Sequence, residues 1–206
     1  MLKVAALVIF ASVVVSGCRY KDSECADYVV VEQHADYEIR SYPALTWVMT
    51  SEESRVPRIA KFKTFRRLFN YISGENDQGI KINMTVPVRM RSTKTDGKTT
   101  LEMSFLLPSV VSSSPPVPND KSLTVSAEDP TLYAVRTFKG YVWREKTWAE
   151  EAAKLSESLR NDETVDKSYY YQVGYDAPFE FFERRNEIWM VKPNGENFSN
   201  EVPDNK

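Results

Sequence analysis

Two related stretches of sequence, YEIRSY at residues 37–42 and YAVRTF at residues 133–138, indicate that the chain contains an internal repeat. Both are rich in aromatic and β-branched residues, which favour the pleated, half-buried surface of a strand. The stretches lie 96 residues apart, and Trp47 and Trp143 keep the same separation. A repeat of this length indicates a fold that is assembled from two similar units.

Each unit is predicted to contain one amphipathic helix. The first helix is expected over Arg58–Ser73, because apolar residues recur there at spacings of three and four. These residues are Ile59, Phe62, Phe65, Phe69 and Ile72. The second helix is expected over Glu145–Arg160, and its apolar face consists of Trp148, Ala152, Leu155 and Leu159.

Further matches follow each helix and extend the repeat. Residues 84–88, MTVPV, parallel residues 175–179, YDAPF, and residues 102–108 parallel residues 187–193. Strands are expected at Tyr28–Glu32, Tyr37–Thr50, Ile80–Arg91, Leu101–Leu107, Leu123–Glu128, Tyr133–Trp143, Tyr169–Tyr175 and Glu187–Lys192. A connector rich in serine and proline, Ser109–Asp120, is expected to hold no regular structure.

The order strand, helix, strand, strand therefore occurs twice, in half-repeats at about residues 37–108 and 123–193. Neither unit can bury its apolar sheet face and helix stripe alone. We therefore expect an α+β fold, in which the duplicated unit forms a distorted antiparallel β-barrel with two flanking helices.

The N-terminal 17 residues have the order of features found in a secretory signal peptide. Lys3 supplies a positive charge, Val4–Val15 is uncharged, and Ser16-Gly17 supplies small residues before Cys18. The apolar run is shorter than the roughly 20 residues of a membrane span, so no stable span is expected. We predict a signal peptide at 1–17, a cysteine-containing arm at 18–27, a domain at 28–193 and a polar tail at 194–206.

The two cysteines, Cys18 and Cys25, leave two alternatives for the mature N-terminus. In an oxidising compartment they can form a disulfide, and the protein would then be secreted. Val15–Cys18 also fits a bacterial lipobox, in which Cys18 would be lipidated and Cys25 would stay free. The pair is no metal site, since no histidine lies near it. A formal net charge of −2 gives no basic surface field for nucleic acid.

Two sequence motifs for asparagine-linked glycosylation are present. Asn83-Met84-Thr85 is expected to lie within a strand and to be inaccessible. Asn197 lies in the polar tail, and we expect it to be glycosylated in a eukaryotic host.

The sequence contains no set of residues arranged for catalysis, so we expect that the protein is not an enzyme. His34 is the single histidine and has no evident serine or acidic partner. Cys25 has no placed base, and Glu150 and Glu151 are helix neighbours that face different ways. No phosphate-binding loop is present.

Two glutamates occupy equivalent positions in the repeat and favour a structural role. Glu102 and Glu187 could each hold an arginine such as Arg40 or Arg136. Ion pairs of this kind commonly support a fold.

Five short motifs are distinctive in combination. They are YEIRxY at 37–42, GIKINMTVPV at 79–88, PPxP at 115–118, GYDAP at 174–178 and RRNEIW at 184–189. In these motifs the chain resembles the SOUL haem-binding family, in particular its animal branch, over roughly Tyr28 to Lys192. The resemblance favours the Cys18–Cys25 disulfide over a lipid anchor, and with it a secreted, extracellular protein.

The resemblance implies binding of haem or related tetrapyrroles without chemistry, for buffering or transport, in an apolar cleft beside the first helix. In one branch of the family a histidine between the arginine and tyrosine of the first motif ligates the iron. This chain has Ser41 there, so haem is expected to bind non-covalently and without that axial ligand. Tyr42 and Tyr175 are candidates for contact with the cofactor. His34 is a candidate iron ligand, with a solvated turn histidine as the alternative.

The first helix has the residue types that such a ligand needs. A porphyrin requires an apolar slot for its ring and cations for its two propionates. The candidates for these roles are Arg58, Lys61, Phe62, Phe65, Arg66 and Phe69. The alternative is an ordinary core stripe with a solvated basic face.

A protein-interaction role, or binding of another apolar ligand by a family fold that has lost haem binding, is the alternative function. Leu155–Asp162 loosely resembles a helix that docks in an apolar groove. Core packing of the same residues explains that pattern equally well.

Overall fold

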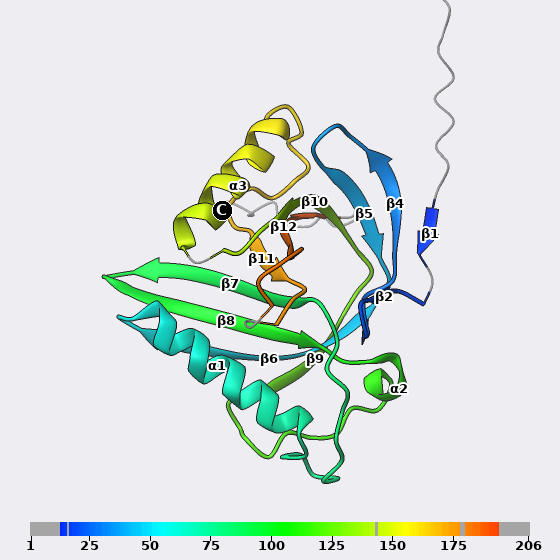
Figure 1. The fold of residues 1–206 in the computed structure, drawn as a ribbon, viewed down its shortest axis with the longest axis vertical. Coiled ribbons are helices and arrows are strands. Elements are labelled where there is room, and N and C mark those ends of the chain that lie inside the picture. Colours follow the sequence, from blue (N-terminus) through cyan, green and yellow to red (C-terminus); the bar gives the residue numbers. More distant parts are fainter. Residues whose placement is uncertain (1–12, 16, 143, 178–179, 194–206) are drawn as a thin grey trace, which may run out of the picture.

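The computed structural model describes residues 13–15, 17–142, 144–177 and 180–193 (Figure 1). It contains three helices, α1 (Pro57–Ile72), α2 (Ser109–Ser112) and α3 (Glu145–Ser158). The N-terminal strands are β1 (Val13–Val15), β2 (Arg19–Tyr20), β3 (Ser23–Glu24), β4 (Tyr28–Gln33), β5 (Glu38–Tyr42) and β6 (Leu45–Ser54). The remaining strands are β7 (Val88–Thr95), β8 (Lys98–Leu106), β9 (Thr124–Glu128), β10 (Thr131–Lys139), β11 (Tyr171–Gly174) and β12 (Arg185–Lys192).

Ten of these strands form one curled antiparallel sheet, and β2 and β3 form a separate hairpin. The order in the large sheet is β1-β4-β5-β10-β12-β11-β7-β8-β6-β9. Apart from β1 and β4, which have no counterparts, the order is symmetric about the β11–β7 junction, where Val173 faces Arg89. The triplet β10-β12-β11 on one side matches β6-β8-β7 on the other, which confirms the α+β class and the duplicated, barrel-like arrangement.

The two halves exchange strands. β5 precedes β6 in the first half but pairs with β10 of the second, and Ile39 faces Ala134 there. β9 precedes β10 in the second half but pairs with β6 of the first, and Val125 faces Val48 there. Each half therefore completes the sheet of the other.

The helices α1 and α3 cover separate parts of the sheet. α1 packs on β6 and β8, and α3 packs on β10 and β12, with α1 low and α3 high in the view of Figure 1. Leu68 and Tyr71 of α1 are fully buried over Met103 and its neighbours. Leu155 of α3 is buried in a second cluster, and a third, aromatic cluster fills the curl of the sheet between the helices.

Local chemistry explains where the strands depart from the sequence-based expectation. The expected strand over residues 37–50 is interrupted at Pro43, since β5 ends at Tyr42 and β6 begins at Leu45. Proline has no amide hydrogen for a strand ladder. The expected strand over residues 80–91 was wrong for its first part, because β7 begins only at Val88, directly after Pro87. The connector at residues 109–120 contains the short helix α2.

The first sequence match also needs correction. It aligned residues 37–42 with residues 133–138, which pairs β5 with β10. By position in the sheet, β10 corresponds to β6 and β5 corresponds to β9. Both β5 and β10 turn aromatic residues into the curl of the sheet, as Tyr42 and Tyr133 show, and so their sequences are similar without being equivalent.

Part of the predicted signal peptide, Val13–Val15, forms β1 and pairs with β4. Residues 1–12 and 16 lie outside the described part of the chain, and removal of residues 1–17 stays a prediction. Within the described ranges no helix is long and apolar enough to cross a membrane.

Candidate ligand-binding site

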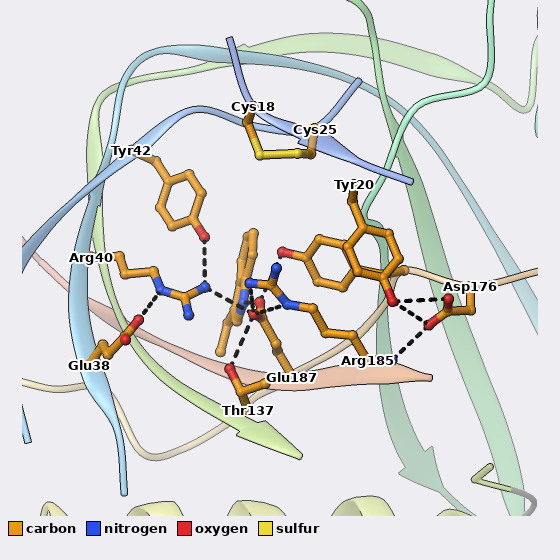
Figure 2. Close-up of polar contacts among 12 residues, drawn as sticks. Cys18, Tyr20, Cys25, Glu38, Arg40, Tyr42, Thr137, Asp176, Arg185 and Glu187 are labelled. Atoms are coloured by element: carbon orange, nitrogen blue, oxygen red, sulfur yellow. Dashed lines mark hydrogen bonds and ion pairs between the residues drawn. A yellow bond between two sulfur atoms is a disulfide. The ribbon is translucent and has the colours of Figure 1, made fainter. Parts of the chain in front are cut away.

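A completely buried carboxylate, Glu187, lies at the centre of the curl of the sheet (Figure 2). Arg40 Nη1 donates to its Oε1 at 3.0 Å and Arg185 Nε donates to the same oxygen at 2.9 Å. Tyr175 Oη and Trp189 Nε1 donate to Oε2 at 3.0 and 2.7 Å. Both carboxylate oxygens therefore have their partners within the protein.

The electrostatics of this cluster keep the carboxylate charged. Burial alone raises the pKa of Glu187, but the positive charges of Arg40 and Arg185 and the bond from Trp189 more than offset it. The pKa of Glu187 therefore lies below its ordinary value. Burial, together with the negative charge of Glu187, raises the pKa of Tyr175 well above its ordinary value, so the phenol stays protonated. The cluster is a satisfied structural network, as the sequence predicted for Glu187 and Arg40.

The disulfide-bonded hairpin β2–β3 covers the cluster. Cys18 and Cys25 are joined, and Cys25 is buried in the aromatic cluster (Figure 2). The ring of Tyr20 meets that of Tyr175 edge-on at 5.3 Å, and its hydroxyl donates to Asp176 at 3.1 Å. The interior is thus filled and closed by the chain itself.

The outer face of α1 is different, because large apolar side chains there are uncovered. Phe62 is 64% exposed, Phe69 48% and Ile59 47%. Phe65 lies between sheet and solvent: its ring packs edge-on against Phe105 and lies almost parallel to Phe69, with ring centroids 5.9 Å apart. Phe62 and Phe69 are therefore not core residues, although the same helix turns Leu68 and Tyr71 inward.

The charged residues on α1 are all basic. Residues 57–72 contain five basic residues and no acidic one. Lys63 and Arg67 both pair with Glu52 of β6 at 2.7 Å. The other three, Arg58, Lys61 and Arg66, are exposed and form no ion pair within the described part of the chain.

Charges on two other segments act on Lys61. Desolvation lowers the pKa of Lys61 although its side chain keeps solvent access, Glu145 opposes this shift, and Arg184 adds to it. Glu145 begins α3, and Arg184 precedes β12. A lysine that is desolvated and still accessible lies in a partly enclosed position.

The predicted site residues fall into separate places. Arg58, Lys61, Phe62, Phe65, Arg66 and Phe69 share α1. Tyr42 and Tyr175 are buried in the curl of the sheet, on the other side of the sheet layer from α1. Ser41 lies on the opposite face of β5 from Tyr42, since successive strand residues alternate.

His34 lies in the turn between β4 and β5, far in the fold from α1 (Figure 1). Its ring stacks on Tyr37 at 4.2 Å, and its Nε2 lies 3.1 Å from a Glu32 oxygen. The described residues contain no group of three or more histidine, cysteine or acidic side chains that could hold a metal ion. Asn197 lies outside the described residues.

The loop before β12 exposes two large apolar side chains that the sequence motifs do not predict. Phe181 and Phe182 are 59% and 86% exposed, in the same loop as Arg184. The sequence does place two adjacent phenylalanines between Glu180 and Glu183. An exposed apolar pair in a polar loop can indicate an interaction site.

Comparison with known proteins identifies the family. The family model of the SOUL heme-binding protein matches residues 23–191. The chain belongs to this family. It is 33% identical over 173 residues to human heme-binding protein 2, covering 82% of this chain and 84% of that protein. It is 35% identical over 130 residues to pig heme-binding protein 1, covering 61% and 68%.

Among solved structures, the chain is similar to the C-terminal domain of EcmrR, with a TM-score of 0.52 and 8% identity. The match covers 75% of this chain and 95% of that one. This likeness concerns the fold alone. The curated relatives are named as heme-binding proteins, and these names describe no enzyme.

Proposed function

We propose that this SOUL-family protein binds haem or a related tetrapyrrole non-covalently on the outer face of α1, without catalysing a reaction. The main supporting observation is the exposure of Phe62 and Phe69 on α1, where Arg58, Lys61 and Arg66 form no ion pair within the described residues. The names of the relatives support haem as the ligand.

The phenylalanines supply the surface for the ring. Phe62 and Phe69 are seven residues apart, which places them on one face about two helical turns apart. Phe65 sits between them and rests on Phe105, so the surface is supported from below. Burying exposed apolar area is worth about 25 cal/mol per Å², which makes a flat apolar ring a favourable occupant.

The cations supply the contacts for two propionates. Arg58 and Arg66 lie four residues before and after Phe62, on the same side of the helix. Arginine binds carboxylates in a planar, two-bond geometry. Lys61 is also exposed on α1 and can act as a third positive charge.

Iron ligation by the chain is not part of this proposal. His34 and the buried Tyr42 lie away from α1, and Ser41 occupies the position that the family resemblance associates with a ligating histidine. The residues on α1 fit the ring and propionates of the cofactor. We therefore expect binding that depends little on the iron. Buffering or transport of the ligand outside the cell, after export, is the role that fits such a site.

The test is a Soret-band titration of the purified protein with ferric haem and, in parallel, with iron-free protoporphyrin. Both should saturate with similar affinity. Replacing Phe62 and Phe69 together by serine should weaken binding by tenfold or more, on the order of the apolar area they lose. Val110→Ser is the matched control, since Val110 is 84% exposed on α2. Saturation by neither ligand would refute haem binding and favour a protein-interaction role.

A further inference from the structure

The first glycosylation motif, Asn83-Met84-Thr85, lies in irregular backbone between α1 and β7, contrary to the expectation that a strand would hide it. Asn83 is exposed, and it lines a shallow surface hollow with Met84 and with Arg19, Asp22 and Glu24 of the disulfide hairpin. No hydrogen bond within the described residues involves its side-chain amide. Adding a large group to this nitrogen therefore breaks no contact of the fold.

We propose that Asn83 carries an asparagine-linked glycan, attached beside the disulfide hairpin during export. The donor is a lipid diphosphate-linked oligosaccharide of the secretory pathway. The amide nitrogen of Asn83 forms a bond to the anomeric carbon of the first sugar, the bond from that carbon to the phosphate oxygen breaks, and the lipid diphosphate leaves. The nitrogen gives up one proton. The disulfide independently fits passage through such an oxidising compartment.

The folded structure fixes when this transfer must happen. Thr85, the third residue of the motif, is 2% exposed, and its hydroxyl donates to the Leu106 carbonyl at 2.5 Å. The motif requires that hydroxyl. Transfer therefore precedes the packing of Thr85 against β8, although the finished glycan on Asn83 is compatible with the fold.

The disulfide hairpin closes over the same segment. The Val86 amide donates to the Glu24 carbonyl at 2.9 Å, and Cys25 pairs with Val86 in a parallel bridge. Docking of this hairpin helps to hold residues 83–86 in their folded path. Glycan transfer and hairpin docking therefore compete, and preventing the disulfide should raise the occupancy of Asn83.

The test uses secretion of the full chain from a eukaryotic cell line, followed by enzymatic removal of asparagine-linked glycans and mass spectrometry. In an Asn197→Gln background, which removes the second motif, the secreted chain should lose the mass of one glycan and show Asn83 converted to aspartate. The Asn83→Gln and Asn197→Gln double variant should show no shift. A secreted Asn197→Gln chain without glycan would overturn the proposal.

The competition between glycan transfer and hairpin docking can be measured in the same cells. Replacing Cys18 and Cys25 by serine should increase the glycosylated fraction at Asn83, and Thr85→Ser, which keeps a hydroxyl, should retain the site. An unchanged fraction in the cysteine variant would overturn the competition with the hairpin. These outcomes do not depend on haem binding, so the two proposals fail independently.

Discussion

Arg40 on β5 and Glu187 on β12 form an ion pair of 3.0 Å across β10, the strand that lies between theirs in the sheet. Arg40 belongs to the first half of the chain and Glu187 to the second. Both side chains are almost or completely buried, at 3% and 0% exposure. The charge pair therefore ties the two halves together where water cannot replace either partner.

Replacing Glu187 by glutamine should lower the free energy of unfolding by about 3 kcal/mol, because Arg185 would lose its counter-charge and the buried Arg40 would keep only Glu38. Denaturant titration followed by tryptophan fluorescence measures this. Glu157→Gln, which breaks an exposed pair with Arg160, should change stability by less than about 1 kcal/mol. Equal effects of both substitutions would contradict the role given to Glu187.

Removing two α1 cations should weaken only ligands that carry carboxylates. Arg58→Gln with Arg66→Gln should reduce protoporphyrin affinity about fivefold, as expected for two exposed ion pairs of about 0.5 kcal/mol each. Affinity for protoporphyrin dimethyl ester should not change. Lys154→Gln on α3 together with Arg160→Gln just after it is the control pair. A parallel loss for acid and ester would show that the arginines do not contact propionates.

Opening the Cys18–Cys25 disulfide should loosen the hairpin over the aromatic cluster. The bond joins residues seven apart, and closure of so short a loop contributes roughly 2–3 kcal/mol by chain entropy. The Cys18→Ser and Cys25→Ser double variant should lose about that much stability and exchange the amide hydrogens of residues 19–26 faster. If exchange stayed at the wild-type rate, the disulfide would not be needed, and contacts such as Tyr20–Asp176 and Val86–Glu24 would hold the hairpin.

Asp162 should contribute stability that disappears in acid. Its burial raises the pKa, but bonds from Lys192 and Thr164 outweigh this and bring the pKa down to about 2. Since the folded pKa lies below the unfolded value of about 3.9, the contribution is complete above that value and is lost as pH falls towards 2. Asp162→Asn should thus be less stable than wild type at pH 7, with the difference shrinking between about pH 4 and pH 2. Thermal melts across this range measure it, and a constant difference would contradict the assignment.

The spacing of apolar residues predicted the bounds of both long helices to within two residues. A helix that buries one face has apolar residues at regular spacings of three and four. The same spacing could not reveal that Phe62 and Phe69 are uncovered while Leu68 is buried. That distinction depends on which side of α1 packs on β6 and β8, which is a property of the assembled sheet.

Long-range packing also explains what the sequence could not show about the interior. Tyr42 and Tyr175 are candidates for ligand contact from the sequence, since both are aromatic residues in the motifs shared with the family. In the fold the Cys18–Cys25 hairpin lies over them from a distant part of the chain. The composition of residues 80–91 predicts a strand that includes Asn83, but Pro87 cannot donate to a strand ladder and β7 begins only at Val88.

The reciprocal pairing of β5 with β10 and of β9 with β6 has a consequence for the origin of the molecule. A single half, expressed alone, would leave three strand edges without their partners, since the β7–β11 pairing is lost as well. Two identical halves could satisfy each other by the same exchange, as a symmetric homodimer. Gene duplication and fusion of such a dimer would give the present chain, and separately expressed halves should fold only when mixed.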